Sequence, residues 1–337
     1  MNPSASAPAL RVSNLIKRYP KAKTNAVDGV SFEVSRGEIF GLLGPNGAGK
    51  TTTIGVLTTA ILPTEGRASI MGVNVARDPI DVKQRIAVVP QQSNLDRSLK
   101  VREILTFHAA YHGVSRKERE PLADKLLNEL GLGERKNEKV NRYSGGMAQR
   151  LMIARALMHG PDVLFLDEPT NNLDPQSRLF LWERIRELNA QGLTILLTTH
   201  DMDEADKLCH RIAIMDHGKI LVNDTSAELK KLIPGGTVLE VRACAPLPED
   251  APVVRERILT ALSALPGATK VDAVDTVDEE QTEPGSLTFR LYAEAANALI
   301  GPAAQTVLVA GAEVRDLSVK QPTLEEVFIF LTGRHLR

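Results

Sequence analysis

The stretch GLLGPNGAGKTTT, residues 41–53, constrains this chain more than any other segment. It fits the pattern G-x-x-x-x-G-K-[ST], and it lies between a continuous apolar run and a segment with a helical pattern. Glycines let backbone N–H groups turn inward around a phosphate chain, and the N-terminus of the following helix adds partial positive charge. We expect Lys50 to reach the outer phosphates and the Thr51 hydroxyl to hold Mg²⁺. The predicted nucleotide-contacting residues here are Gly44, Pro45, Asn46, Gly47, Ala48, Gly49, Lys50, Thr51 and Thr52.

An acidic pair follows another apolar run, in VLFLDEP at residues 163–169. A buried parallel strand would deliver Asp167 and Glu168 at its carboxyl end, where ligands of parallel sheets bind. Asp167 is predicted to orient Mg²⁺, and Glu168 to polarise an attacking water molecule. Such a pair alone is usually a solvated strand end, but together with the phosphate loop it predicts a site of phosphate chemistry.

The composition is that of a globular chain without the excess of positive charge that is typical of nucleic-acid-binding proteins. Of the 337 residues, 43% are apolar and 25% charged, and the formal net charge is -1, so no nucleic-acid partner is expected. Cys209 and Cys244 have no metal-like spacing and are expected to be reduced thiols. The N-terminus lacks the features of a signal peptide, and no run approaches the roughly 18 apolar residues of a membrane span. We expect a cytoplasmic chain that could dock on a membrane.

The order of patterns predicts an α/β phosphate-loop NTPase with a small α+β domain after it. Residues 1–9 are expected to be a disordered lead, 10–235 the nucleotide-binding domain, and 236–337 the C-terminal domain, with a Pro- and Gly-containing boundary at 233–237. The C-terminal order β-α-β-β-α-β suits a ferredoxin-like fold, and Thr323 with Glu326 fits a capping box for a last helix.

Within the first domain, continuous apolar runs predict strands buried on both faces of a parallel sheet. They cover 39–44, 86–89, 163–166, 194–199 and 212–215. The segments 10–19 and 27–34 alternate and favour an antiparallel edge subdomain. Helices are predicted at 50–60, 101–112, 117–130, 145–159, 175–190 and 202–208, of which 101–130 forms a helical insertion.

Together these motifs resemble an ATP-binding cassette (ABC) ATPase, and further segments extend the resemblance over residues 10 to about 225. The loop YSGGMAQR resembles the family signature loop, in which Ser144, Gly145 and Gly146 would meet the γ-phosphate bound by the opposite subunit. The resemblance implies that Gln91 senses Mg²⁺ and the membrane partner, and that His200 contacts the γ-phosphate. It also implies that Asp174 lies in the loop that crosses the dimer, and that Tyr19 stacks on adenine.

The subgroup is similar to the ATPases of ABC-2 type exporters, on the segments YSGGMAQRLMIARALMHGPDVLFLDEPTNNLDPQSR, TTHDMDEADKLCHRIAIMDHGKI and PTLEEVFIFLTGR. The resemblance implies an ATP- and Mg²⁺-dependent subunit that energises export through a multi-spanning permease on a separate chain. It also implies a second ATPase subunit, expected as a homodimer, at the cytoplasmic face of the membrane. Tyr143, Met147, Asn171 and Asn172 depart from the commonest family pattern; the Asn residues tolerate left-handed backbone, so the turn can survive.

Other functions remain as alternatives. A soluble ABC ATPase acting on the ribosome or on DNA is disfavoured by a single phosphate loop, the lack of sustained heptads and the lack of basic excess. A subunit that binds ATP without turnover is disfavoured by Glu168 and His200, and an importer ATPase by the tail pattern. For the C-terminal domain, dimer packing and a regulatory or partner-binding role both stay open.

Overall fold

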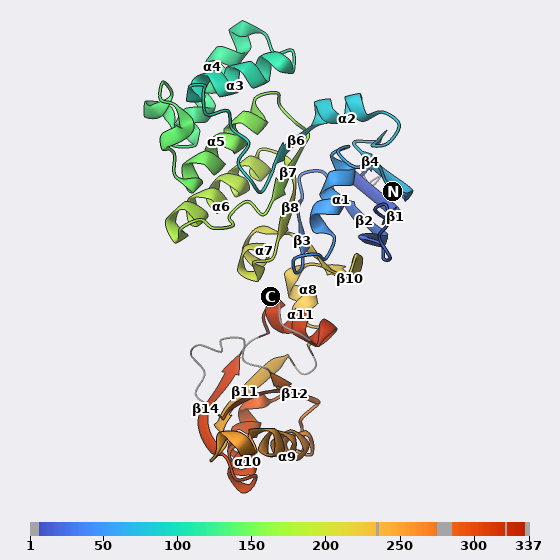
Figure 1. The fold of residues 1–337 in the computed structure, drawn as a ribbon, viewed down its shortest axis with the longest axis vertical. Coiled ribbons are helices and arrows are strands. Elements are labelled where there is room, and N and C mark those ends of the chain that lie inside the picture. Colours follow the sequence, from blue (N-terminus) through green and yellow to red (C-terminus); the bar gives the residue numbers. More distant parts are fainter. Residues whose placement is uncertain (1–6, 234–235, 275–284, 321, 334–337) are drawn as a thin grey trace, which may run out of the picture. The chain divides into compact units, whose positions relative to one another are not determined.

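The computed structural model describes residues 7–233, 236–274, 285–320 and 322–333. The internal contacts divide the chain into two units, with the division between Ser226 and Ala227, and each unit is described by itself (Figure 1). The predicted boundary at 233–237 lies partly outside the described residues. The acidic segment 276–285, which the sequence predicts to be a solvated loop, lies almost entirely outside them. Of the predicted disordered lead only residues 7–9 are described. That prediction is wrong for Ala9, which is fully buried and whose amide donates to the Val34 carbonyl.

A six-stranded sheet forms the centre of the first unit, in the order β10-β9-β3-β8-β7-β6. Its strands are β3 (Ile39–Leu43), β6 (Ile86–Val89), β7 (Val163–Asp167), β8 (Thr194–Thr199), β9 (Arg211–Asp216) and β10 (Lys219–Asp224). All neighbouring pairs are parallel except β9 with β10. Every residue of β3, β7 and β8 is buried, which confirms the prediction of parallel strands covered on both faces.

An antiparallel sheet packs beside this centre, in the order β2-β1-β4-β5. It contains β1 (Leu10–Lys17), β2 (Val27–Val34), β4 (Glu65–Ile70) and β5 (Val73–Asn74). The first two are the antiparallel strands that the alternating segments predict. Helix α1 (Lys50–Leu57) shares one hydrophobic core with both sheets, including Phe32 stacked on Phe40 at 5.1 Å. The helix is shorter than predicted because Thr59 adopts a left-handed conformation with φ 63°.

Helices surround the six-stranded sheet. They are α2 (Pro79–Arg85), α3 (Val101–Tyr111), α4 (Arg116–Glu129), α5 (Gly145–Leu157), α6 (Pro175–Ala190) and α7 (Met202–Leu208), with short 3-10 turns η1 (Gly133–Arg135) and η2 (Val140–Arg142). The predicted helical insertion is confirmed as α3 and α4, which lie above α5 in Figure 1. Helix α2 was not predicted, because among its residues only Val82 is buried and no apolar stripe marks it.

The second unit has the predicted β-α-β-β-α-β order. Its sheet has the order β12-β13-β11-β14, all antiparallel, and its core lies between this sheet and two helices. The elements are α8 (Ser226–Lys230, which begins at the division between the units), β11 (Thr237–Cys244), η3 (Pro248–Asp250), α9 (Ala251–Ser263), β12 (Lys270–Val274), β13 (Ser286–Ala293), α10 (Ala296–Val309), β14 (Glu313–Lys320) and α11 (Leu324–Thr332). The capping box of α11 is confirmed: Thr323 accepts from the Glu326 amide at 3.3 Å, and Glu326 accepts in return.

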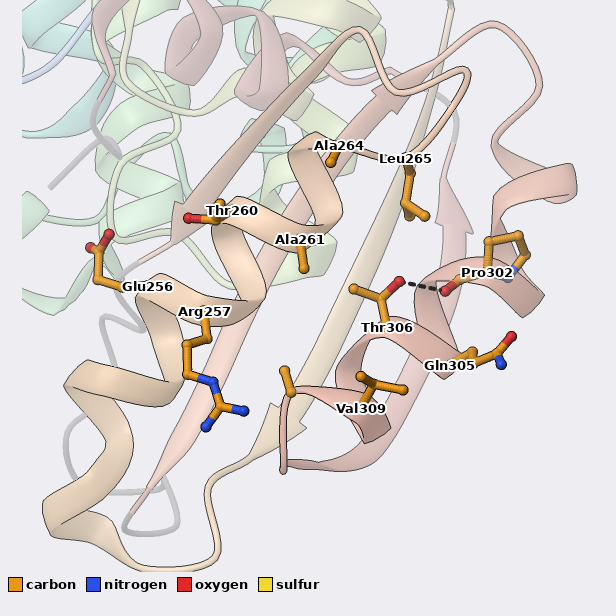
Figure 2. A pocket seen from close by; sticks show the side chains of 11 residues that line it. Glu256, Arg257, Thr260, Ala261, Ala264, Leu265, Pro302, Gln305, Thr306 and Val309 are labelled. Atoms are coloured by element: carbon orange, nitrogen blue, oxygen red, sulfur yellow. Dashed lines mark hydrogen bonds between the residues drawn. The ribbon is translucent and has the colours of Figure 1, made fainter.

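A groove with a volume of about 850 Å³ runs between α9 and α10 of the second unit (Figure 2). The Thr306 hydroxyl on its wall donates to the Pro302 carbonyl at 2.8 Å, within one helix. Across all the described ranges, α9 and α10 included, no helix combines the length and the apolar character that crossing a bilayer demands.

Burial in the parallel sheet predicts which leucines carry stability. Leu196→Ala in β8 removes a fully buried side chain and should lower the free energy of unfolding by about 3 kcal/mol. Leu179→Ala on α6 removes one that is 56% exposed, and should change it by less than about 0.5 kcal/mol. Urea unfolding followed by the fluorescence of Trp182, the chain's single tryptophan and a residue of the first unit, measures both. Equal losses in the two variants would contradict the assigned core.

Candidate nucleotide-binding site

The phosphate loop joins β3 to α1 in a conformation that requires glycine at two of its positions. A Cβ atom on Gly44 would lie 2.2 Å from the Met215 carbonyl oxygen, and one on Gly49 would lie 2.5 Å from the Ala26 carbonyl oxygen. Gly49 also has φ 105°, a conformation that residues with a side chain rarely adopt. The loop is therefore packed against the backbone behind it, and it leads directly into the first turn of α1.

Lys50 is the first residue of α1, and its side chain is only 4% exposed. Its ammonium group donates to the carbonyl oxygens of Gly44 at 2.6 Å and Pro45 at 3.1 Å. It also lies 3.7 Å from Oε1 of Glu168. Burial lowers the pKa of Lys50, and the negative charges of Glu168 and Asp167 oppose that shift. The lysine charge is thus held at the base of the phosphate loop by carbonyls and carboxylates together.

Asp167 ends β7 and faces two hydroxyl groups from neighbouring elements. The Thr198 hydroxyl of β8 donates to Oδ1 of Asp167 at 2.5 Å, and the Thr51 hydroxyl of α1 lies 3.5 Å from the same oxygen. Burial raises the pKa of Asp167, and the Thr198 hydrogen bond opposes that shift. A carboxylate and a hydroxyl are oxygen ligands of the kind that Mg²⁺ prefers. Thr198 was not predicted, because its role depends on the register of β7 with β8.

Glu168 is the point at which the other predicted residues meet. It has φ 47°, uncommon for a residue with a side chain, and its amide donates to the Thr198 carbonyl at 3.0 Å. Its Oε2 accepts from the side-chain amides of Gln91 at 3.0 Å and Asn171 at 3.1 Å. Nδ1 of His200 lies 3.3 Å from the same oxygen. This carboxylate, 8% exposed, therefore has a fixed orientation beside Lys50.

Asn171 is a site residue that the sequence analysis did not assign. It departs from the commonest family pattern, and the signal that could have identified it is its position three residues after Glu168. Side-chain amides at this spacing can reach back across a tight turn. The neighbouring Asn172 has φ 58°, a left-handed conformation of the kind that Asn tolerates.

Tyr19 lies at the edge of the same group. Its hydroxyl is 3.4 Å from the Thr52 hydroxyl, and its side chain is 41% exposed. The ammonium group of Lys17 lies 5.3 Å from the centre of the ring. The ring therefore presents an accessible face next to the first turn of α1.

The remaining predicted residues form a second group at the N-termini of α5 and α6. Ser144 caps α5 by accepting from the Met147 amide at 3.3 Å, and Asp174 caps α6 by accepting from the Ser177 amide at 2.9 Å. A Cβ atom on Gly146 would lie 2.5 Å from the Ser177 hydroxyl, so these two helix starts are closely packed. Ser144 and Gly145 are exposed. Within the described part of the chain, no hydrogen bond joins this group to the phosphate loop.

Comparison with known proteins agrees with this geometry. The family model for the ABC transporter matches residues 27–171. A daunorubicin resistance ATP-binding protein of Streptomyces coeruleorubidus is 38% identical over 328 residues, covering 96% of this chain and 95% of the relative. A linearmycin resistance ATP-binding protein of Bacillus subtilis is 34% identical over 97% of this chain and 99% of the relative. A Nod factor export ATP-binding protein of Ralstonia nicotianae is 38% identical over 98% and 96%.

Solved structures give the same result for the fold. An ATP-binding subunit of an ABC transporter is 33% identical, with a TM-score of 0.61 over 66% of this chain and 92% of its own. A dimeric ATP-binding cassette in a post-hydrolysis state, bound to ADP and Pi, is 27% identical, with a TM-score of 0.60 over 64% of this chain and 98% of its own. The chain therefore belongs to the ABC transporter family, as an ATP-binding and ATP-hydrolysing subunit related to the ATPases of exporters.

Proposed function

We propose that this chain energises export through a separate membrane-spanning permease, working as a homodimer at the cytoplasmic face of the membrane. The observation that carries the ATPase part is the meeting of Lys50, Gln91, Glu168 and His200 beside the phosphate loop. The export part is supported by full-length relatives, two named for drug resistance and one for export.

The nucleotide would be bound by backbone, charge and an aromatic face. Residues 44–52 would surround the phosphates with backbone N–H groups at the start of α1, and Lys50 would neutralise the outer phosphates. The exposed ring of Tyr19, beside Thr52, is suitably placed for stacking on adenine.

The donor set suits Mg²⁺. The Thr51 hydroxyl and the Asp167 carboxylate lie 3.5 Å apart, and burial disfavours the ionised form of Asp167, which a divalent cation would restore. Thr51 and Asp167 would hold the ion, with Gln91 as the further residue assigned to it. When bound, the ion would neutralise charge that develops on the phosphate oxygens.

Glu168 would act as the base that orients and polarises the attacking water. Gln91 and Asn171 hold one of its oxygens, and Oε1 lies nearer Lys50. His200, next to the same carboxylate, would contact the γ-phosphate. Because Gln91 donates directly to Glu168, any displacement of the loop after β6 would shift the Glu168 carboxylate. This hydrogen bond offers a route for coupling ATP hydrolysis to a partner.

A second copy would complete each site. Ser144 and Gly145 are exposed at the start of α5, where Gly146 follows them, and a helix N-terminus attracts anions. Because this group is not joined to the phosphate loop of its own chain, we assign it to the nucleotide of the opposite subunit, with Asp174 at the dimer crossing. The dimeric cassette among the related structures supports this arrangement.

The helical insertion and the Gln91 loop would contact the permease. On α3, the side chains of Phe107 and Tyr111 are 57% and 88% exposed, unusual for aromatic residues unless a partner covers them. Selectivity for the exported molecule would then lie in the permease.

Removal of the lysine charge should weaken nucleotide binding. Lys50→Ala is expected to raise the dissociation constant for ATP about tenfold or more, because a charge-assisted contact to the phosphates is lost. Titration with a fluorescent ATP analogue measures this, with the exposed Lys125→Ala of α4 as matched control. Unchanged affinity in Lys50→Ala would remove the lysine from the phosphate site.

Removal of the base should separate binding from hydrolysis. Glu168→Gln keeps the shape and hydrogen-bonding capacity of the side chain, so ATP should still bind, while the hydrolysis rate falls by about 10²- to 10⁴-fold. Size-exclusion chromatography with ATP should then show an accumulated dimer. Glu183→Gln, at an exposed position of α6, is the control. Brisk turnover by Glu168→Gln would exclude Glu168 as the base.

Composite sites can be tested by mixing two inactive variants. Lys50→Ala disables the phosphate loop, and Ser144→Arg blocks the exposed start of α5. A mixed dimer contains one site with both defects and one intact site. An equal mixture should therefore recover up to about a quarter of the wild-type ATPase rate by random pairing. A mixture as inactive as its components would contradict sites shared between two chains.

A further inference from the structure

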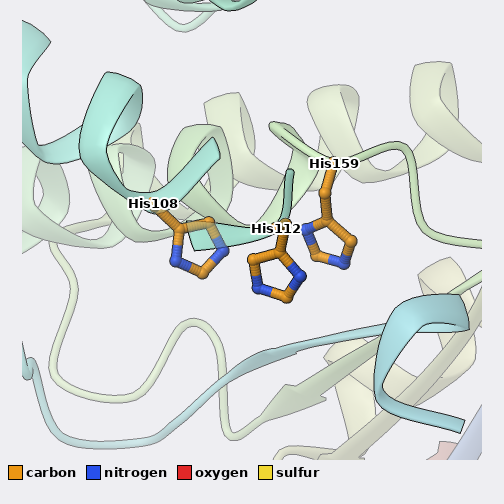
Figure 3. Close-up of side chains that lie close together, drawn as sticks. All are labelled: His108, His112 and His159. Atoms are coloured by element: carbon orange, nitrogen blue, oxygen red, sulfur yellow. The ribbon is translucent and has the colours of Figure 1, made fainter. Parts of the chain in front are cut away.

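Three histidines gather away from the nucleotide site, between α3 and the segment that follows α5 (Figure 3). His108 and His112 are four residues apart, which places them on one face at the end of α3, and His159 follows the end of α5. One ring nitrogen from each lies within 4.8 Å of the others, and all three side chains are partly buried. Neither the ATPase chemistry nor the phosphate loop uses them.

The hydrogen bonds of the cluster leave lone pairs unused. Nε2 of His159 lies 2.9 Å from the Ile86 carbonyl oxygen, which can only accept, so this nitrogen carries the proton. Nδ1 of His159 is then an acceptor, and within the described structure it is buried without a hydrogen-bond partner, as is Nε2 of His108. Buried polar atoms usually have partners, so two in one cluster require an explanation.

We propose that His108, His112 and His159 form a binding site for a divalent transition metal ion of the zinc class. Neutral imidazole is a ligand that Zn²⁺, Ni²⁺ and Cu²⁺ prefer, whereas Mg²⁺ and Ca²⁺ prefer oxygen. The bond from His159 to a backbone carbonyl is the outer contact that commonly orients a metal-binding histidine. Three histidines leave a fourth position for water.

The rings must turn to share one ion. Metal–nitrogen bonds of about 2.0–2.1 Å in a tetrahedron place the nitrogens about 3.3 Å apart, closer than the 4.8 Å limit of the cluster. The rings of His112 and His159 are stacked, with centres 4.0 Å apart and planes at 10°, so their lone pairs do not yet converge. Rotation of the His112 ring, whose centre lies 4.7 Å from that of His108, would turn its lone pair toward a point shared with the other two rings.

The charges around the cluster set the expected strength of binding. The histidines lie in a cavity of about 880 Å³ that Arg155 and Lys83 also line, and none of the described lining residues is acidic. Burial lowers the pKa of His108 to about 4 and lowers the pKa values of His112 and His159 as well, which favours the neutral form of the rings. The positive charge of Arg155, whose guanidinium is bonded to Asn94, opposes a cation and makes the site weaker than an all-neutral one.

A bound ion would link the helical insertion to the parallel sheet. It would connect the end of α3 with the segment between α5 and β7, and through His159 with the start of β6. Since the unfolded chain cannot hold this geometry, the ion should stabilise the first unit, by an amount that rises with the logarithm of its concentration above the dissociation constant.

Cobalt reports the ligands directly. Co²⁺ titrated into the full chain, without nucleotide, should produce the visible absorption of a low-symmetry nitrogen site, and Zn²⁺ should displace it. Zn²⁺ at about 100 times its dissociation constant should raise the melting temperature, followed by Trp182 fluorescence, by about 5 °C or more. Both effects should be lost in His112→Gln and His159→Gln.

His217→Gln is the matched control, since His217 is 80% exposed and lies outside the cluster. It should bind cobalt as the wild type does. Ions held only by Thr51 and Asp167 would bind equally in every histidine variant and without a nitrogen spectrum. That result, or the absence of any cobalt absorption in the wild type, would overturn the proposal; the wild-type measurement holds even if a variant folds poorly.

Discussion

The register of the parallel strands is the constraint on which the rest of the site depends. Parallel strands end at one edge, so β3, β6, β7 and β8 bring the phosphate loop, Gln91, the acidic pair and His200 to the same place from segments far apart in the chain. In this register Asp167 of β7 pairs with Thr198 of β8, and Leu43 of β3 pairs with Thr199. The pairing also places the Thr198 hydroxyl where it donates a hydrogen bond to Asp167. A slip of one residue would turn these side chains to the other face of the sheet and separate Asp167 from the Thr198 hydroxyl.

Burial makes the charges of this site interdependent. Lys50, Asp167 and Glu168 are 4%, 7% and 8% exposed, and an isolated charge at such depth would be strongly destabilising. Together they compensate one another, and water exclusion strengthens their action on a phosphate: unit charges 4 Å apart interact by about 1 kcal/mol in water and about 4 kcal/mol near a protein surface. The same arrangement explains the uncommon backbone at Glu168, which the contacts from Gln91, Asn171 and Thr198 stabilise.

The sequence predicts those parts of this structure that depend on residues adjacent in the chain. Continuous apolar runs indicate the parallel strands, and motif residues follow directly at strand ends, so the phosphate loop and the acidic pair can be placed without coordinates. Helix α2 could not, since it buries little more than Val82. Asn171 reaches the Glu168 side chain across a turn that begins at Glu168, where φ is 47°, and Thr198 reaches Asp167 through strand register. The histidine cluster joins α3 to a residue after α5, a proximity that no local pattern reports.

If ATP hydrolysis by this chain moves the helices of a membrane-spanning partner, that partner should co-purify with it. The Glu168→Gln variant, tagged and produced in the native cell, is extracted from membranes in mild detergent with ATP, and the proteins that accompany it are identified by mass spectrometry. We expect a multi-spanning membrane protein in stoichiometric amount, retained less well by Lys50→Ala. Ribosomal subunits or nucleic acid in its place, with no membrane protein, would contradict a role in export and indicate an ATPase that acts on the ribosome or on nucleic acid.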